Sequence, residues 1–227
     1  MSQIASWNVR GLNWPNKQED VKLLLQFNNI GLVGLLETKI KRHKVEYTAS
    51  NIFCGWDWVN NYDISNGRIW VAWKPSSYTL TILEKTDQLI HCEATQLSTC
   101  KHFHITFIYG HNLELQRQSL WDALHHISRS TQGAWCILGD FNTILPKDDR
   151  LGGNEVSDHD IQEMSNFMGT CEVQEMSSFG AHFTWTNKTI WSKINRVLIN
   201  SWWHEDFDFT LAKTLPQGLP DHTSPLI

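Results

Sequence analysis

The chain has 227 residues, which is enough for one large domain with a substantial core. Only 19% of the residues are charged and 11% are aromatic, with 12 tryptophans, so the composition excludes a disordered chain. The net charge of −5 argues against a protein that coats nucleic acid through bulk positive charge. A local basic run is nevertheless present, KIKRHK at residues 39–44.

The chain shows no secretory signal, no long apolar run, no linker rich in proline, glycine or serine, and no internal repeat. Its five cysteines have no regular spacing, as is typical of reduced thiols. We therefore expect an intracellular protein without membrane attachment, organised as one domain over residues 1–227.

The first half of the chain predicts strands and one helix. Residues 2–8 form a strand, and a helix follows from Pro15, because proline fits the first helical turn. A short apolar strand at 31–36 ends at Glu37. Residues 56–109 contain several strand-like segments, and turn residues lie between them. This arrangement predicts a meander of antiparallel strands.

The second half predicts two helices, at 114–130 and at 157–169, the latter capped by Ser157. The expected strands are 134–140, 182–187, 193–200 and 207–212. Hairpins mixed with helical crossovers indicate an α/β fold, a four-layer α/β sandwich in which two packed, mostly antiparallel sheets are flanked by helices.

The strand at 193–200 is apolar on both faces, which predicts burial on both sides. Because side chains alternate along a strand, Asn195, Val197 and Ile199 share one face. Ile194 and Leu198 lie on the other face. An uncharged amide and the neighbouring arginine at 196 are unusual in such a strand.

Polar residues stand where several of these strands end, so we expect them to meet along one sheet edge. Carboxylates, amides and an imidazole gathered in this way suit metal-assisted hydrolysis of a phosphate ester. Their oxygen ligands suit Mg²⁺, with Mn²⁺ as the alternative metal. The residues are Asn8, Glu37, Asp140, Asn142, Asp221 and His222.

Six motifs along the chain resemble those of the endonuclease/exonuclease/phosphatase superfamily, which includes DNase I and exonuclease III-like enzymes. They occur in the same order and at similar spacing, from residue 4 to residue 226: IASWNVRGLN, GLLETK, FIYGHN, LGDFN, SKINRV and PDHTSPL. The segments DDRLGGN, GAHFTWTN and SKINRVLIN are similar to the endonuclease domain of plant LINE-type retrotransposons.

The resemblance implies an enzyme that nicks double-stranded DNA and leaves a 5′-phosphate and a 3′-hydroxyl. In the plant elements that hydroxyl primes reverse transcription, so we expect a reverse transcriptase region in a longer parent chain and action in the nucleus. It also implies a monomer that uses a divalent metal and no small organic cofactor.

The resemblance assigns a role to each matched position. Glu37 corresponds to the principal metal ligand, Asn8 supports the metal and the phosphate, and Asp221 is a second carboxylate on the metal side. For catalysis, the matched residues are Asp140, which orients or deprotonates the attacking water; Asn142 and Tyr109, which contact the scissile phosphate; and His222, which neutralises a phosphate oxygen.

DNA contacts are expected from basic and hydroxyl side chains near this edge. Arg196 is expected to turn toward the DNA-facing edge or toward a carboxylate. The other candidates are Lys39, Lys41, Arg42 and Lys44 of the basic run, Arg150 in a loop, and the hydroxyl of Thr184 or Thr186.

Two positions depart from the family pattern. Asn195 stands where the family has an aspartate that orients the active-site histidine and stabilises its positive charge. At the C-terminal motif Pro220 replaces a serine, and one residue is added between His222 and Pro225. Both changes affect the histidine, so we expect reduced activity.

Two other functions stay open for the same fold. A decayed nuclease could act as a DNA- or protein-binding module, and a phosphatase could act on inositol phosphates or phospholipids. A structural zinc site is not expected, because the spacing of Cys92, Cys100, His102 and His104 fits no usual zinc motif.

Overall fold

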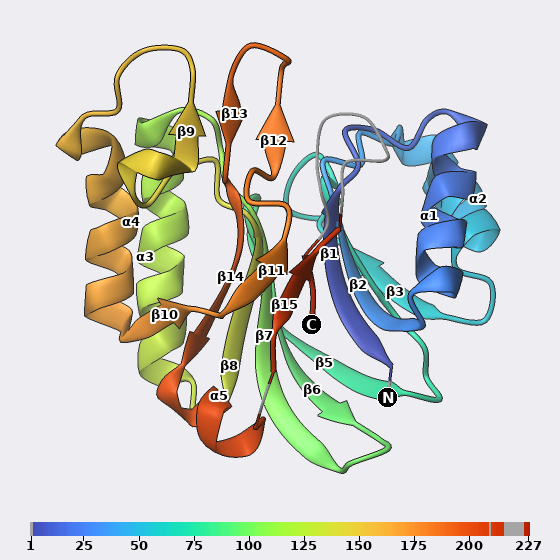
Figure 1. Cartoon of the computed structure of the whole chain (residues 1–227). Coiled ribbons are helices and arrows are strands. Elements are labelled where there is room, and N and C mark those ends of the chain that lie inside the picture. The colour runs from blue at the N-terminus through green and yellow to red at the C-terminus, as the bar shows by residue number, and fades with distance from the viewer. Residues whose placement is uncertain (1, 209, 216–224) are drawn as a thin grey trace.

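The computed structural model describes residues 2–208, 210–215 and 225–227. Two packed sheets form its centre, and helices cover the outer face of each (Figure 1). The helices are α1 (Pro15–Phe27), α2 (Val45–Ile52), α3 (Glu114–Ser130), α4 (Asp158–Cys171) and α5 (Ser201–Asp206), with short 3₁₀ turns η1 (Arg42–Lys44) and η2 (Lys147–Asp149).

The first sheet has seven strands and packs against α1 and α2. In spatial order they are β11 (Ser178–Gly180), β15 (Ala212–Thr214), β16 (Pro225–Leu226), β1 (Gln3–Asn8), β2 (Ile30–Leu36), β4 (Ile69–Trp73) and β3 (Asp57–Asn60). The pairs β1–β2 and β11–β15 are parallel, and the other four pairs are antiparallel.

The second sheet has six strands and packs against α3 and α4. Their order is β10 (Val173–Glu175), β14 (Asn195–Asn200), β8 (Trp135–Asp140), β7 (Lys101–Tyr109), β6 (Leu89–Gln96) and β5 (Tyr78–Lys85). Only β7–β8 is parallel. The predicted four-layer sandwich of mostly antiparallel sheets is therefore confirmed.

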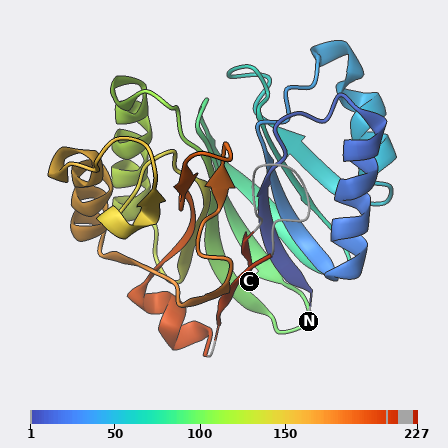
Figure 2. The same cartoon turned by 45° about the horizontal axis from the view of Figure 1, so that its top comes forward.

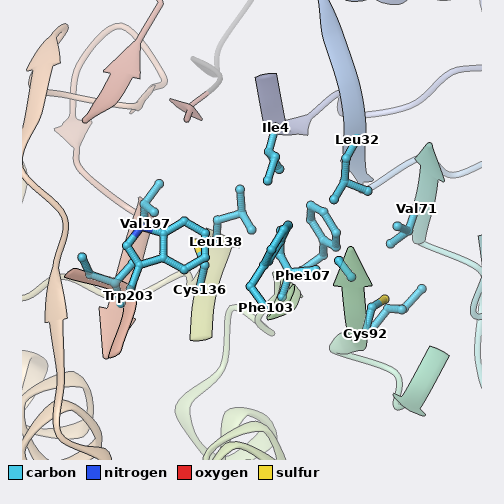
Figure 3. Packing of buried hydrophobic residues seen from close by; sticks show 14 of the residues in the cluster. Ile4, Leu32, Val71, Cys92, Phe103, Phe107, Cys136, Leu138, Val197 and Trp203 are labelled. Atoms are coloured by element: carbon cyan, nitrogen blue, oxygen red, sulfur yellow. The ribbon is translucent and has the colours of Figure 1, made fainter. Parts of the chain in front are cut away.

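The main core fills the space between the sheets (Figure 3). Ile4 and Leu32 of the first sheet face Phe107 and Leu138 of the second. Gly34 allows this close approach, because a Cβ atom there would lie 2.1 Å from Cδ1 of Phe107. Burying large apolar side chains stabilises each by about 1.5–3 kcal/mol relative to exposure, so this layer dominates the stability of the fold.

A third sheet of three short strands was not predicted. It contains β12 (Trp185–Thr186), β13 (Trp191–Ser192) and β9 (Arg150–Leu151), which pair antiparallel. In Figures 1 and 2 these yellow and orange strands project from the end of the sandwich where β8 and β14 meet the loops. We call it the accessory sheet.

Several local predictions are confirmed, and two are wrong. Ser157 caps α4 and forms a reciprocal pair of bonds with Asp160. The meander over 56–109 is wrong, because β3 and β4 belong to one sheet and β5–β7 to the other. Alternation reports which residues are buried but not which sheet a strand joins. The strand at 207–212 is also wrong, since Ala212 is the only one of its described residues that lies in a strand. None of the helices in the described part of the chain is both long and apolar enough to cross a bilayer.

His91 of β6 is a buried imidazole on the outer face of the second sheet. Its Nδ1 lies 2.8 Å from Oγ1 of Thr106, and its ring stacks on that of His104 with centroids 5.6 Å apart. Burial, with a smaller contribution from the charge of His104, lowers the pKa of His91 to about 3. The folded protein therefore keeps this ring neutral where an exposed histidine would be protonated.

Acid should destabilise the fold through His91. Between pH 6.5 and about 3 the unfolded chain binds a proton at this ring that the folded chain does not. The free energy of unfolding therefore falls as the pH falls, by up to about 1.4 kcal/mol per pH unit from this group. Urea unfolding across this range should show a shallower pH dependence for His91→Gln and an unchanged one for the exposed control His126→Gln. Equal slopes for His91→Gln and wild type would contradict the assignment.

Candidate active site

Strand ends from the two sheets meet at one end of the sandwich. In the first sheet the parallel pair β1–β2 places Asn8 beside Leu36, the residue before Glu37. In the second sheet Asp140 of β8 is paired with Tyr109 of β7 on one side. The polar ends of four strands are thereby brought to the same edge.

A cavity of about 320 Å³ opens at this edge. Six of the residues predicted from sequence line it: Asn8, Glu37, Tyr109, Asp140, Asn142 and Arg150. Five other lining residues were not predicted as site residues: Arg10, Asn112, Trp185, Ser192 and Ile194. All five lie within the motifs IASWNVRGLN, FIYGHN, GAHFTWTN and SKINRV, so the signal was the motif itself rather than any property of the single residue.

A hydrogen bond between Asn8 and Asp140 joins the two sheets inside the cavity. Nδ2 of Asn8 donates to Oδ2 of Asp140 at 2.7 Å, and the backbone N–H of Asn142 donates to Oδ1 at 3.0 Å. The other end of the Asn8 amide accepts from the backbone N–H of Arg10 at 3.1 Å. Both ends of that amide are therefore used, which fixes its orientation.

Asp140 is a buried carboxyl, with only 1% of its surface exposed. Burial raises its pKa to about 7, and the nearby carboxylate of Glu37 acts in the same direction. The bonds from Asn8 and Asn142 and the charge of Arg10 oppose this rise. A carboxyl with a pKa near neutrality can both accept and release a proton, which suits a general base.

Tyr109 is buried beside the two carboxylates. Burial is the largest cause that raises its pKa to about 12, and Glu37 and Asp140 add to it. The guanidinium of Arg68 opposes the rise and lies over the ring, with its Cζ 6.0 Å from the centroid. The hydroxyl therefore stays protonated at neutral pH and is available as a hydrogen-bond donor toward the cavity.

Glu37 follows β2 in a left-handed backbone conformation, with φ of 54°. Such a φ is costly for a residue other than glycine or asparagine, and strained residues cluster at functional sites. Its carboxylate pairs with Nζ of Lys39 at 2.6 Å, and the Lys39 side chain is 46% exposed. A flexible surface lysine is a partner that an incoming cation could displace.

The donor set at this edge fits a magnesium ion. Within the described residues no three His, Cys, Asp or Glu side chains are grouped so as to hold a metal by themselves. Magnesium, however, is commonly bound through only one or two carboxylates and keeps several waters. Glu37 and Asp140 supply two carboxylates around a polar cavity, and the chemistry of this set suits that hydrated ion.

Arg117 of α3 holds two of the loops around the cavity, a role that no sequence motif indicated. Its Nη1 donates to the carbonyls of His111, Asn112 and Asn142 at 2.8, 3.0 and 3.1 Å. Its Nη2 pairs with Glu163 of α4 at 2.6 Å. The two cavity-lining asparagines are thereby tied to the helical layer.

Asn195 is buried next to Asp140, its partner across β8 and β14. Its backbone N–H and its Nδ2 both donate to Oγ1 of Thr184, at 2.9 and 3.2 Å. The NH₂ end of the amide is thus directed to Thr184. Because Thr184 is 2% exposed and also accepts from the N–H of Ile194, the predicted DNA contact of its hydroxyl is wrong.

Arg196 is a buried ion-pair residue, so its assignment as a DNA contact is wrong and its turn toward a carboxylate is confirmed. Its side chain is fully buried and pairs with Asp149 of η2 and with Glu175 of β10. It also donates to the carbonyl of Lys193 at 3.1 Å. Burial lowers its pKa to about 10, so the guanidinium remains charged at neutral pH.

The contacts of Arg196 attach the accessory sheet to the second sheet. Asp149 directly precedes Arg150 of β9, and its carbonyl accepts from the N–H of Lys193, next to β13, at 2.8 Å. Arg150 lines the cavity, and its Nε lies 3.4 Å from Oγ of Ser192. The position of Arg150 therefore depends on Arg196 beneath it.

The basic run is exposed except for Ile40, which packs in the core under α1 and α2. Arg42 and Lys44 lie in η1, and neither they nor Lys41 line the cavity. Their roles as DNA contacts stay predictions. Asp221 and His222 lie outside the described residues, and so does the added residue after the histidine.

The model of one protein family, the endonuclease/exonuclease/phosphatase family, matches residues 5–213. The chain belongs to this family. The resemblance expected from the sequence is therefore confirmed, and the family is one of hydrolytic nucleases and phosphatases. No curated protein sequence is similar enough to count as a relative.

Solved structures share the fold at low sequence identity. The endonuclease domain of TRAS1, a telomere-specific non-LTR retrotransposon, has a TM-score of 0.77 and 9% identity, covering 99% of this chain and 96% of that domain. The catalytic domain of Xenopus laevis APE2 has a TM-score of 0.66 and 16% identity, covering 99% and 90%. A mannosyl-6-phosphatase of Bacteroides thetaiotaomicron has a TM-score of 0.66 and 11% identity, covering 100% and 98%.

Removing one partner of the buried Arg196–Asp149 pair should destabilise the protein strongly, because the other charge is left buried and unpaired. Arg196→Met or Asp149→Asn should each lower the free energy of unfolding by about 3–5 kcal/mol. The double variant should lose less than the sum of the two. Urea unfolding measures this, with Lys85→Met, from the partly exposed Lys85–Asp63 pair, as a control that changes stability by less than about 1 kcal/mol. Additive losses in the double variant would show that the pair is not a unit.

Proposed function

We propose that this family member is a Mg²⁺-dependent endonuclease that nicks double-stranded DNA and leaves a 3′-hydroxyl for target-primed reverse transcription. One observation carries the proposal: carboxylates from both sheets, Glu37 and Asp140, line one polar cavity, and Asn8 of the first sheet donates to Asp140 of the second there. The likeness to the TRAS1 endonuclease domain over nearly the whole chain supports the choice of a nuclease.

In this proposal Glu37 and Asn8, with Asp221 as the second carboxylate, hold the divalent ion. When bound, the ion polarises the phosphoryl group and offsets the charge that develops on it. Lys39, which pairs with Glu37 and is half exposed, would be free to contact a DNA phosphate if an ion took its place at Glu37. Mn²⁺ is the expected substitute, because it accepts the same oxygen ligands.

The remaining residues position the reactants for in-line displacement at phosphorus. Asp140 accepts a proton from water, whose oxygen forms the new bond to phosphorus, and the bond to the 3′ oxygen breaks. That oxygen takes up a proton and becomes the 3′-hydroxyl, and the 5′-phosphate stays on the other strand end. Tyr109 and Asn142 donate to the phosphate oxygens, with His222 as the further phosphate contact.

Arg150 at the cavity and the exposed cations of the basic run would contact the DNA backbone. The chain then acts as a monomeric domain of a longer polypeptide that carries a reverse transcriptase, and it acts in the nucleus, where its DNA substrate lies. The support for this part is the resemblance to plant LINE elements in DDRLGGN, GAHFTWTN and SKINRVLIN.

A plasmid-nicking assay tests the proposal. Supercoiled plasmid should become open circles with Mg²⁺ and stay supercoiled with EDTA. Glu37→Gln and Asp140→Asn should each lower the rate by about two orders of magnitude or more, because each removes a charge from the reacting centre. The exposed Asp122→Asn on α3 is the matched control and should nick like wild type. Plasmid that stays supercoiled at high enzyme, together with phosphate release from inositol phosphates, would favour the phosphatase instead.

Asn195 supports a second candidate, a nuclease fold that binds DNA but has lost catalysis. Replacing Asn195 by aspartate should raise the nicking rate by about tenfold or more, since the carboxylate restores the negative charge that the family places beside its histidine. Thr184 can accommodate the change by donating its hydroxyl proton to the new carboxylate. Thr184→Val should lower the rate of the Asn195→Asp variant. If Asn195→Asp nicks no faster than wild type, the weakening assigned to Asn195 is wrong.

A further inference from the structure

Trp14 is a large aromatic side chain that the mechanism does not use. It is the last residue of the loop between β1 and α1, residues 9–14, and 71% of its surface is exposed. Tryptophan is highly buried on average, so a ring this exposed is uncommon.

The loop that carries Trp14 is held in place by its neighbours. Leu12 is fully buried, and its backbone N–H donates to the carbonyl of Thr38 at 2.8 Å. Gln18 of α1 donates to the carbonyl of Leu12, and Asn13 donates through Nδ2 to the carbonyl of Lys39, both at 2.8 Å. The indole therefore projects from a rigid support, and little ordering is needed when it binds a ligand.

The loop that carries Trp14 reaches the cavity and presents cations. The same loop presents Arg10, which lines the cavity, and the adjoining segment presents Lys39 and Lys41 to solvent. An exposed aromatic ring among cations is the combination with which proteins hold single-stranded nucleic acid, where bases stack on rings and cations follow the phosphates. An apolar protein partner would leave these charges uncompensated.

We propose that Trp14 stacks on an unpaired base of the DNA beside the bond that is cut. Inside a duplex both faces of each base are covered by the neighbouring bases, so away from the ends the ring can stack only where a base is unpaired. The favoured substrate is therefore a duplex that has a single-stranded tail or bulge next to the cleavage site. This inference rests on the proposed function, since it names the substrate of the same cavity.

Binding without cleavage tests the inference. In EDTA, fluorescence anisotropy should show wild type binding a duplex with an unpaired tail at least about fivefold more tightly than the same duplex with blunt ends, as expected for one stacked base. Trp14→Ala should abolish this ratio, and Trp14→Phe should retain most of it. A 2-aminopurine in the tail should be quenched by wild type and not by Trp14→Ala.

The matched control is Trp202 on α5, which is 55% exposed and lies at the opposite end of the sandwich from the accessory sheet (Figure 1). Trp202→Ala should keep the wild-type ratio. Equal affinities of wild type for both duplexes, or an unchanged ratio in Trp14→Ala, would overturn the inference while leaving plasmid nicking intact. If plasmid is not nicked but the ratio depends on Trp14, the catalytic proposal fails and the stacking contact stands.

Discussion

The close packing of the two sheets is the constraint on which the site depends. Gly34 lets Phe107 lie against the backbone of β2, and the strand ends of both sheets are then near enough to touch. The bond between Asn8 and Asp140, 2.7 Å long, is the point where that packing reaches the cavity. A larger side chain at position 34 would separate the sheets and the two halves of the site with them.

A second buried interaction sets the rim of the cavity. Arg196 is charged and fully enclosed, which is costly unless every partner is in place. Its partners Asp149 and Glu175 come from two separate segments, and the first directly precedes Arg150. The second sheet thereby determines where the accessory sheet lies. As a result, the guanidinium of Arg150 reaches the cavity from β9, a strand of only two residues.

In the cavity, two buried acidic groups lie near a glutamate whose charge is balanced by a lysine. Asp140 and Tyr109 have raised pKa values because they are buried near Glu37, while Lys39 neutralises the exposed side of that glutamate. The two carboxylates repel each other in this arrangement, and a divalent cation of the kind proposed would relieve that repulsion. The neutral amide of Asn195 adds no charge to this balance, which is why the substitution to aspartate tests the catalytic state so directly.

The sequence alone determined the three longest helices, most strands of the two large sheets, the burial of β14 on both faces and the residues at the strand ends, because alternation, caps and turn residues act over a few neighbours. It did not indicate α2, α5 or the accessory sheet. It also indicated the family through short motifs. Only the tertiary structure decided that β3–β4 and β5–β7 belong to different sheets, that Arg196 points into the protein rather than toward DNA, and that Arg117 holds Asn112 and Asn142. Those features arise between residues far apart in the chain, such as Asn8 and Asp140, and their partners are chosen by packing and charge compensation that no local pattern records.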